Sequence, residues 1–234
     1  LTRGALGTSA AAHADGATVT DASDFSGWGT ALPANQTTLE PGLWSLDNFG
    51  EVLIATIANG ETFTWNPSAS NRLTVRASKS TSGFATSNNP TASRITLISP
   101  TARHLIHLGT ETTIGTTSTQ DDMFIRFSVQ EDINTFTPTS TNTAGTLRLQ
   151  DGTKIVGALK AKESILVFTD NALYTMKYIG SPFYFGVEQV GTNCGLIGRN
   201  AAVEVDGVAY WMSSKGFLLY DGTVKTLPCS VEDE

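Results

Sequence analysis

Residues 155–190 read IVGALKAKESILVFTDNALYTMKYIGSPFYFGVEQV, and this stretch decides the fold. Its second apolar run, Ile165–Phe168, is apolar at every position, which is typical of an inner strand covered on both faces. Asp170-Asn171 then provides a turn before the next run. The stretch therefore predicts a four-stranded antiparallel sheet, with strands at Ile155–Leu159, Ile165–Phe168, Leu173–Tyr178 and Tyr184–Val190.

Similar units recur along the chain, with turns such as Asn59-Gly60, Asp206-Gly207 and Asp221-Gly222 between the runs. These dipeptides provide the positive φ angles that tight hairpins need. Four-stranded propeller blades repeat about every 40–50 residues. The second strands begin at Val52, Leu105, Ile165 and Val208, and the first two intervals exceed that length, which implies loop insertions. The other expected strands are Leu43–Asp47, Val52–Ile57, Thr62–Trp65 and Leu73–Ala77; Ile95–Ile98, Leu105–Leu108, Met123–Val129 and Thr146–Leu149; and Ala201–Val205, Val208–Met212, Phe217–Tyr220 and Val224–Leu227.

The pattern predicts an all-β fold, a propeller-like array of about four antiparallel blades. A β-sandwich is the alternative, because its strands also recur at short, regular intervals. We expect an irregular N-terminal arm over residues 1–41 and a β-propeller-like domain over residues 42–234, as part of a longer chain. The Thr-rich segment Gly109–Asp122 is expected to be an insertion loop.

The acidic balance limits the partners. A net charge of −7 and a pI near 4.9 disfavour tight nucleic-acid binding, which depends on Lys and Arg neutralising phosphates. No apolar run approaches the roughly 20 residues that cross a bilayer, so we expect no membrane binding by this segment. Cys194 and Cys229 are expected to be two reduced thiols, with a single disulfide as the alternative.

Residues that could carry catalysis are few. The three histidines are His13, His104 and His107, and the last two are expected on one strand with side chains on opposite faces. Three acidic clusters, Asp121-Asp122, Glu131-Asp132 and Glu232–Glu234, lack a distinctive context for glycoside chemistry. We therefore predict that the chain is not an enzyme, with no catalytic, cofactor-binding or metal-binding residues and no cofactor.

Two other groups have structural and functional interpretations. Lys154, Lys160 and Lys162 share parity, so they could form a charged strand edge that prevents stray sheet pairing, or a stripe facing a pore or nucleic acid. The aromatic run Phe183–Phe185 is interpreted as packing between blades or a subunit contact rather than a platform for bases. Gly191–Gly198 is Gly-rich, and we interpret it as a corner between strands.

Several segments together resemble one family. They are Leu43–Glu51, Asn171–Gly180, Gly191–Gly198, Gly207–Met212, Tyr220–Gly222 and Leu227–Cys229. In order and spacing they are similar to the propeller region of the tail nozzle proteins of short-tailed bacteriophages, also called tail tubular protein B. The resemblance covers roughly residues 42–234, and members of the family are usually several times longer.

The resemblance implies a virion structural protein with no catalytic residues. It implies a hexameric ring below the portal and adaptor, contacts with tail fibre proteins, and passage of genomic DNA at ejection without sequence-specific binding. It places the protein in the virion tail, assembled in the host cytoplasm. The alternative function is a carbohydrate-binding or glycoside-hydrolysing β-propeller, which needs an acidic and aromatic cleft.

Overall fold

The computed structural model describes residues 42–67, 78–79 (backbone only) and 89–228. Residues Gly42–Glu234 form one compact unit. The irregular arm predicted for residues 1–41 lies outside the described residues, as do His13, Cys229, Glu232–Glu234 and the predicted strand Leu73–Ala77. Among the described residues no helix has the length and hydropathy needed to cross a bilayer.

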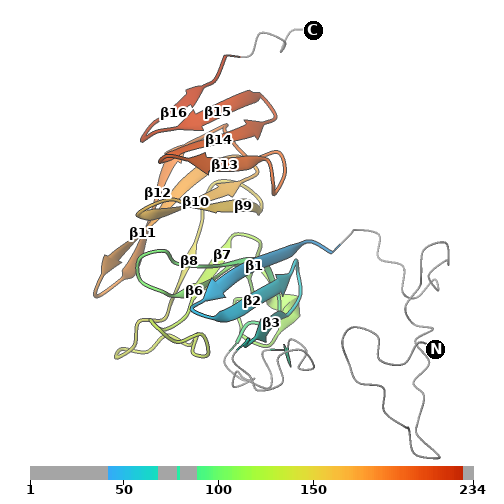
Figure 1. Ribbon diagram of the computed structural model, residues 1–234, viewed down its shortest axis with the longest axis vertical. Helices are drawn as coiled ribbons and strands as arrows, with labels where there is room; N and C mark the ends of the chain where they lie inside the picture. Colours follow the sequence, from blue (N-terminus) through green and yellow to red (C-terminus); the bar gives the residue numbers. More distant parts are fainter. Residues whose placement is uncertain (1–41, 68–77, 80–88, 229–234) are drawn as a thin grey trace, which may run out of the picture. The chain divides into compact units, whose positions relative to one another are not determined.

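Sixteen strands form four antiparallel sheets of four, and each sheet follows the chain order (Figure 1). The first sheet contains β1 (Trp44–Phe49), β2 (Val52–Ile57), β3 (Thr62–Trp65) and β4 (Ser78–Lys79). The second contains β5 (Ser93–Ile98), β6 (Leu105–Thr110), β7 (Phe124–Phe127) and β8 (Gly145–Arg148). The third contains β9 (Ile155–Lys160), β10 (Ser164–Thr169), β11 (Leu173–Gly180) and β12 (Tyr184–Gly191). The fourth contains β13 (Ala202–Val205), β14 (Val208–Ser213), β15 (Gly216–Tyr220) and β16 (Val224–Thr226).

The predicted fold class is confirmed. Each sheet is a four-stranded meander and the sheets succeed one another along the chain, as blades do in a propeller. The alternative of a β-sandwich is wrong, because the strands form four separate sheets instead of two packed ones. All four strands of the third sheet overlap their predicted positions, and Ile165–Phe168 is buried throughout.

Two local expectations need correction. The insertion loop predicted for Gly109–Asp122 begins later, because Gly109 and Thr110 belong to β6. A bridge between Glu111 and Gln120 then closes the loop around the short 3-10 helix η2 (Thr117–Thr119). The longer excursion is the connection from β7 to β8, residues 128–144, which places Phe136 in the core.

The turns are also only partly as expected. Asp206 and Gly207 both have positive φ (52° and 85°), as the tight turn between β13 and β14 requires. The turn at Asn59-Gly60 is shifted by one residue. The Gly60 amide donates to the Ile57 carbonyl at 2.9 Å, so the central residues are Ala58 and Asn59, and of these only Asn59 has positive φ.

Three apolar clusters join consecutive sheets, and the largest lies between the second and third. It includes Ile106, Ile125, Ile165 and Phe185. The cluster between the first and second sheets includes Ile54 and Phe136. The cluster between the third and fourth sheets includes Leu166, Phe168, Leu173, Trp211 and Leu218. Burial of apolar surface between sheets is therefore the main stabilising contact of the unit.

Candidate functional site

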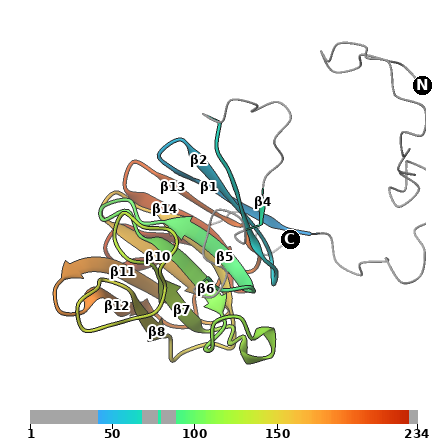
Figure 2. The same ribbon diagram turned by 90° about the horizontal axis from the view of Figure 1, so that it is seen from below.

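The first strands of the sheets border a pair of adjoining cavities, which we call the hub cleft. One cavity, of about 380 Å³, is bordered by β1, β5 and β9 and by the chain that leads into β13. The other, of about 460 Å³, shares Ile95 and Arg199 with the first. Figure 2 shows β1, β5 and β13 from below. The charged residues that line the two cavities are Asp47, Arg94, Lys154, Lys160, Asp170 and Arg199.

Both carboxylate oxygens of Asp47, on β1, have partners in the hub cleft. Its Oδ2 lies 2.5 Å from the Lys160 ammonium, at the end of β9, and accepts the Ile98 amide at 2.6 Å. Its Oδ1 accepts the amide of Asn48 at 2.8 Å. The carboxylate thus joins three sheets, and its charge is neutralised by Lys160.

Arg94 extends from β5 and is also anchored. Its Nε donates to the Ile155 carbonyl at 3.0 Å, and its Nη1 donates to Asp122 Oδ2 at 3.1 Å. The side chain lies against Gly109, where a Cβ atom would be 2.6 Å from Arg94 Cδ and where φ is +62°. A side chain at position 109 would therefore displace Arg94.

Arg199 differs from these residues because its charge has no acidic partner. It lies in the connection between β12 and β13, and its Nη2 donates to Ser45 Oγ on β1. In the part of the chain that the structure describes, no carboxylate lies within 4 Å of its guanidinium. Burial lowers the pKa of Arg199, and the positive charge of Arg94 lowers it further.

A glycine on β9 fixes the path of the chain at Arg199. A Cβ atom at Gly157 would lie 2.5 Å from Leu196 Cδ2 and 3.2 Å from the Arg199 carbonyl oxygen. Glycine is therefore needed where the connection crosses β9 closely. The Gly-rich segment Gly191–Gly198 forms most of this connection, which agrees with its interpretation as a corner.

The remaining charges of the hub cleft lie at the start of β9. Lys154 lines the second cavity, and no described carboxylate forms an ion pair with it. The Asp170 carboxylate instead accepts the Thr153 amide at 2.8 Å and the Thr153 hydroxyl. Burial raises the pKa of Asp170, but these hydrogen bonds outweigh it and hold the pKa below its usual range.

The predicted lysine stripe is only partly present. Lys160 ends β9, which is an edge strand of its sheet, and Lys154 directly precedes that strand. Both face the hub cleft. Lys162 lies in the turn before β10 and borders a different cavity, together with Glu163. Two of the three lysines thus line the hub cleft, whereas Lys162 lines a separate cavity.

The histidines pack in two different environments. His104 directly precedes β6 and lies against Phe185, with ring centroids 5.1 Å apart, and its Nδ1 lies 2.6 Å from the Ser128 carbonyl oxygen. His107, within β6, contacts Phe136 and bonds to Ser93 Oγ at 2.5 Å. The prediction that they sit on one strand is wrong for His104. Residues 42–67 and 89–228 hold no group of three His, Cys, Asp or Glu side chains that could bind a metal ion.

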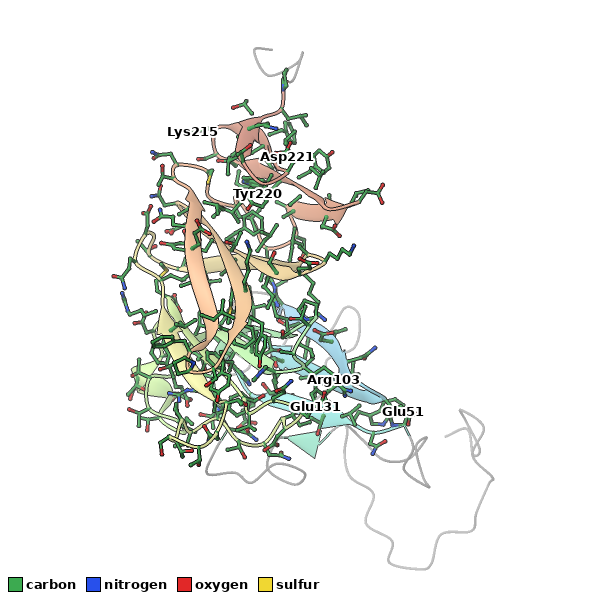
Figure 3. The ribbon with its side chains drawn as sticks, turned by 90° about the vertical axis from the view of Figure 1, so that its left-hand side faces the viewer. Glu51, Arg103, Glu131, Lys215, Tyr220 and Asp221 are labelled. Carbon is green, nitrogen blue, oxygen red and sulfur yellow. The ribbon has the colours of Figure 1, made fainter. Side chains whose placement is uncertain are left out.

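Three carboxylates of the described acidic clusters form ion pairs, and the fourth, Asp132, accepts the Asn134 amide at 2.7 Å. Asp121 binds Arg148 at 2.7 Å, and Asp122 binds Arg94. Figure 3 shows Glu131 beside Arg103, whose Nε lies 3.3 Å from its Oε2. Glycoside hydrolysis needs two carboxylates that face each other across a cleft, and these three each face an arginine instead.

The aromatic run and Cys194 have structural surroundings. Phe185 is buried against Phe127, with ring centroids 4.8 Å apart, whereas Phe183 is exposed. Cys194 is a buried free thiol whose pKa is raised by burial. Its carbonyl oxygen accepts the indole N–H of Trp211 at 2.8 Å.

The residues of the hub cleft that the sequence reasoning missed are Asp47, Arg94 and Arg199. Asp47 ends one predicted strand and Arg94 directly precedes another, and a charged residue beside an apolar run was the only available signal. Arg199 follows the Gly-rich connection directly. The contacts among them depend on the assembly of different sheets, which no local pattern reports.

Comparisons with known proteins provide little beyond the fold. No protein-family model matches the chain, and no curated protein matches it. Among solved structures, the chain is similar to the computationally designed Ika4 protein, with a TM-score of 0.43 and 8% sequence identity over 79% of this chain and 93% of that one. A similarity at this level supports no conclusion about function.

Proposed function

We propose that this chain is a structural component of the tail nozzle of a short-tailed bacteriophage, and that it acts by self-association into a ring instead of by catalysis. The observation that carries the proposal is that the first and last sheets both have an apolar face on which none of the other described sheets packs. Large exposed apolar patches on folded proteins mark interaction surfaces.

The first-sheet face consists of the side chains that alternate with those packed on the second sheet. Ser45, Thr56 and Thr62 share the covered side, as their register and their hydrogen bonds to one another and to Thr96 require. The opposite side is mainly apolar, and Leu46 is 66% exposed. Its apolar members are Trp44, Leu46, Leu53, Ala55, Ile57, Phe63 and Trp65, and Asn48 lies opposite Leu53 on the same side.

The last-sheet face is built in the same way. Trp211 and Leu218 are paired across β14 and β15 and belong to the cluster shared with the third sheet. The residues that alternate with these two along β14 and β15, and those paired with them on β13, point away from the third sheet. Among them Val203 is 53% exposed. The apolar members of this face are Val203, Val205, Val208, Tyr210, Met212, Phe217 and Leu219, and Lys225 lies beside Leu219 at its β16 edge.

A second copy of the chain is the occupant that we propose for these faces. The three sheet-to-sheet contacts within the chain already pack one apolar sheet face on the next. Packing the last-sheet face of one copy on the first-sheet face of the next would continue the same kind of contact. Such a head-to-tail contact is heterologous, and it forms a ring when the rotation closes.

The sequence resemblance adds the biological setting. The matching segments include β1 with its turn, β11, the connection around Arg199, and β14. The proposal places the chain in a virion tail assembled in the host cytoplasm, with a portal or adaptor and tail fibre proteins as further partners. Six copies, and the passage of genomic DNA without sequence-specific binding, are the arrangement that the resemblance implies.

The test is the oligomeric state of the full chain, measured by sedimentation over a range of concentrations. We expect wild-type protein to form a closed oligomer. Leu46→Lys on the first-sheet face and Val203→Lys on the last-sheet face should each give monomers, because a lysine cannot be buried there unpaired. Thr141→Lys, which adds the same charge in the exposed connection between β7 and β8, is the control and should assemble like wild type.

A mixture of the two variants tests the head-to-tail geometry itself. Leu46→Lys leaves the last-sheet face intact, and Val203→Lys leaves the first-sheet face intact. The mixture should therefore form one-to-one dimers that do not grow further. Wild-type protein that stays monomeric at all concentrations, or variants that assemble as wild type does, would contradict the proposal.

A further inference from the structure

The hub cleft concentrates positive charge in an acidic protein. Four basic side chains line its two cavities, and only two carboxylates, Asp47 and Asp170, line them with those cations. Asp47 is neutralised by Lys160, whereas Asp170 keeps its negative charge, accepts hydrogen bonds from Thr153 and forms no ion pair with a described cation. Two cations, Arg199 and Lys154, therefore have no acidic partner among the described residues.

The position of Arg199 makes the imbalance energetically significant. The side chain is half-buried, and its charge lies close enough to Arg94 for the two to interact unfavourably. Burying a charge is costly unless it is paired, and a like charge nearby increases the cost. The hydroxyl of Ser45, which is neutral, accepts one Arg199 donor but does not compensate the charge.

The donors of Arg199 suit a particular class of ligand. Its Nε and Nη1 make no hydrogen bond to other described residues, whereas Nη2 is held by Ser45. A guanidinium presents its donors in a planar fork that matches the oxygens of phosphate or carboxylate groups. The Arg94 guanidinium and Lys154 add positive potential to the same cleft, which favours a doubly charged anion over a single carboxylate.

We propose that the hub cleft binds a multiply charged oxyanion, a phosphate group, on the guanidinium of Arg199, with Arg94 and Lys154 supplying further positive charge. The three residues proposed to bind the anion, Arg199, Arg94 and Lys154, lie outside the two apolar sheet faces, so the proposal can be tested separately from the proposed assembly. The phosphate could belong to a free phosphate compound or to a nucleic-acid strand, which share the chemistry that Arg199 recognises.

The experiment is calorimetric titration of the full chain with pyrophosphate at low ionic strength. We expect saturable binding by the wild type and about tenfold weaker binding by Arg199→Gln, because a charge-assisted, bidentate contact is lost. Arg148→Gln is the matched control. It makes the same substitution at an exposed arginine on β8, paired with Asp121 and outside the cleft, and should change affinity by less than about twofold.

Two additions keep the test decisive. If Arg199→Gln does not fold, Lys154→Gln alters an exposed residue and should still weaken pyrophosphate binding by about threefold. A short single-stranded oligodeoxynucleotide, displaced by pyrophosphate, would identify a nucleic-acid strand as the source; binding of pyrophosphate alone would identify a free phosphate compound. No saturable binding of pyrophosphate by wild type, or an equal loss in Arg148→Gln, would overturn the proposal.

Discussion

The two faces of the last sheet have similar composition but opposite surroundings. Along β14, Ala209 and Trp211 are packed against the third sheet, whereas Tyr210 and Met212, which alternate with them, face away from it. Trp211 is 2% exposed and Met212 is 39% exposed. An apolar strand face therefore indicates that another sheet packs on it, but it does not show whether that sheet belongs to the same chain or to another copy.

The same contrast distinguishes the faces between consecutive sheets, which are covered, from the outer faces of the first and last sheets. Between the second and third sheets, apolar side chains on both partners are buried together. At the ends, the outer faces are also mainly apolar and have no partner sheet within the described part of the chain. Burial contributes about 25 cal/mol per Å² of apolar surface, so the covered faces supply the stability, and the end faces could supply it only on association.

The largest expected effect tests the covered face of the last sheet. Trp211→Ala removes an indole that packs on Phe168, with ring centroids 5.3 Å apart, and leaves the Cys194 carbonyl oxygen without its donor. We expect a loss of about 3–5 kcal/mol in the free energy of unfolding, measured by denaturant titration. A loss below about 1 kcal/mol would mean that the third and fourth sheets are not held together by this cluster.

The second effect concerns a titratable group on a covered face, between the first two sheets. Burial, together with the positive charge of Arg126, lowers the pKa of His107 from 6.5 to about 3. The unfolded chain therefore binds a proton that the folded chain does not bind. Above pH 6.5 His107 is neutral in both states and this difference does not affect the free energy of unfolding. Below pH 6.5 the difference lowers the free energy of unfolding progressively, until the pH falls to about 3.

The measurement is the free energy of unfolding at several pH values between 6.5 and 4.5. The slope should reach roughly 1.4 kcal/mol per pH unit for His107 alone. His107→Asn keeps a polar group near Ser93 and should flatten the slope, although it lowers stability at neutral pH by leaving space beside Phe136. An unchanged slope in the variant would show that other groups account for it.

The strands were predictable because their signals are local. Runs such as Ile165–Phe168 combine high β propensity with nearby turn residues, so both the strand and its burial follow from a short window. The turn at Asn59 was misplaced by one residue, since Asn and Gly can each provide a special conformation and the dipeptide does not determine which one does.

The hub cleft was not predictable for a different reason. Lys154 and Lys160 were singled out by their parity, but the partner of Lys160 is Asp47, on a sheet distant in sequence. Arg94 and Arg199 come together only because successive sheets bring their first strands to one cleft. Contacts of this kind depend on tertiary arrangement, for which composition and periodicity contain no signal.

A smaller effect is expected from the polar contact across a covered face. The Thr96 hydroxyl donates to Thr56 Oγ1 at 2.8 Å, and Thr56 in turn bonds to Thr62 at 2.7 Å, all within the buried contact of the first two sheets. Thr96→Val has nearly the same shape and should cost about 1–2 kcal/mol in the free energy of unfolding. Thr141→Val, in an exposed loop, is the control, and an equal cost there would contradict a specific role for this network.

The smallest effect is expected on the uncovered face of the last sheet. Phe217 lies opposite Met212 on that face, so Phe217→Ala should cost less than about 1 kcal/mol when unfolding is measured at low protein concentration. At higher concentration the cost should increase, because association buries the same face and couples assembly to folding. A cost close to that of Trp211→Ala at every concentration would show that the face is covered within a single chain, and the distinction between the two faces of this sheet would be lost.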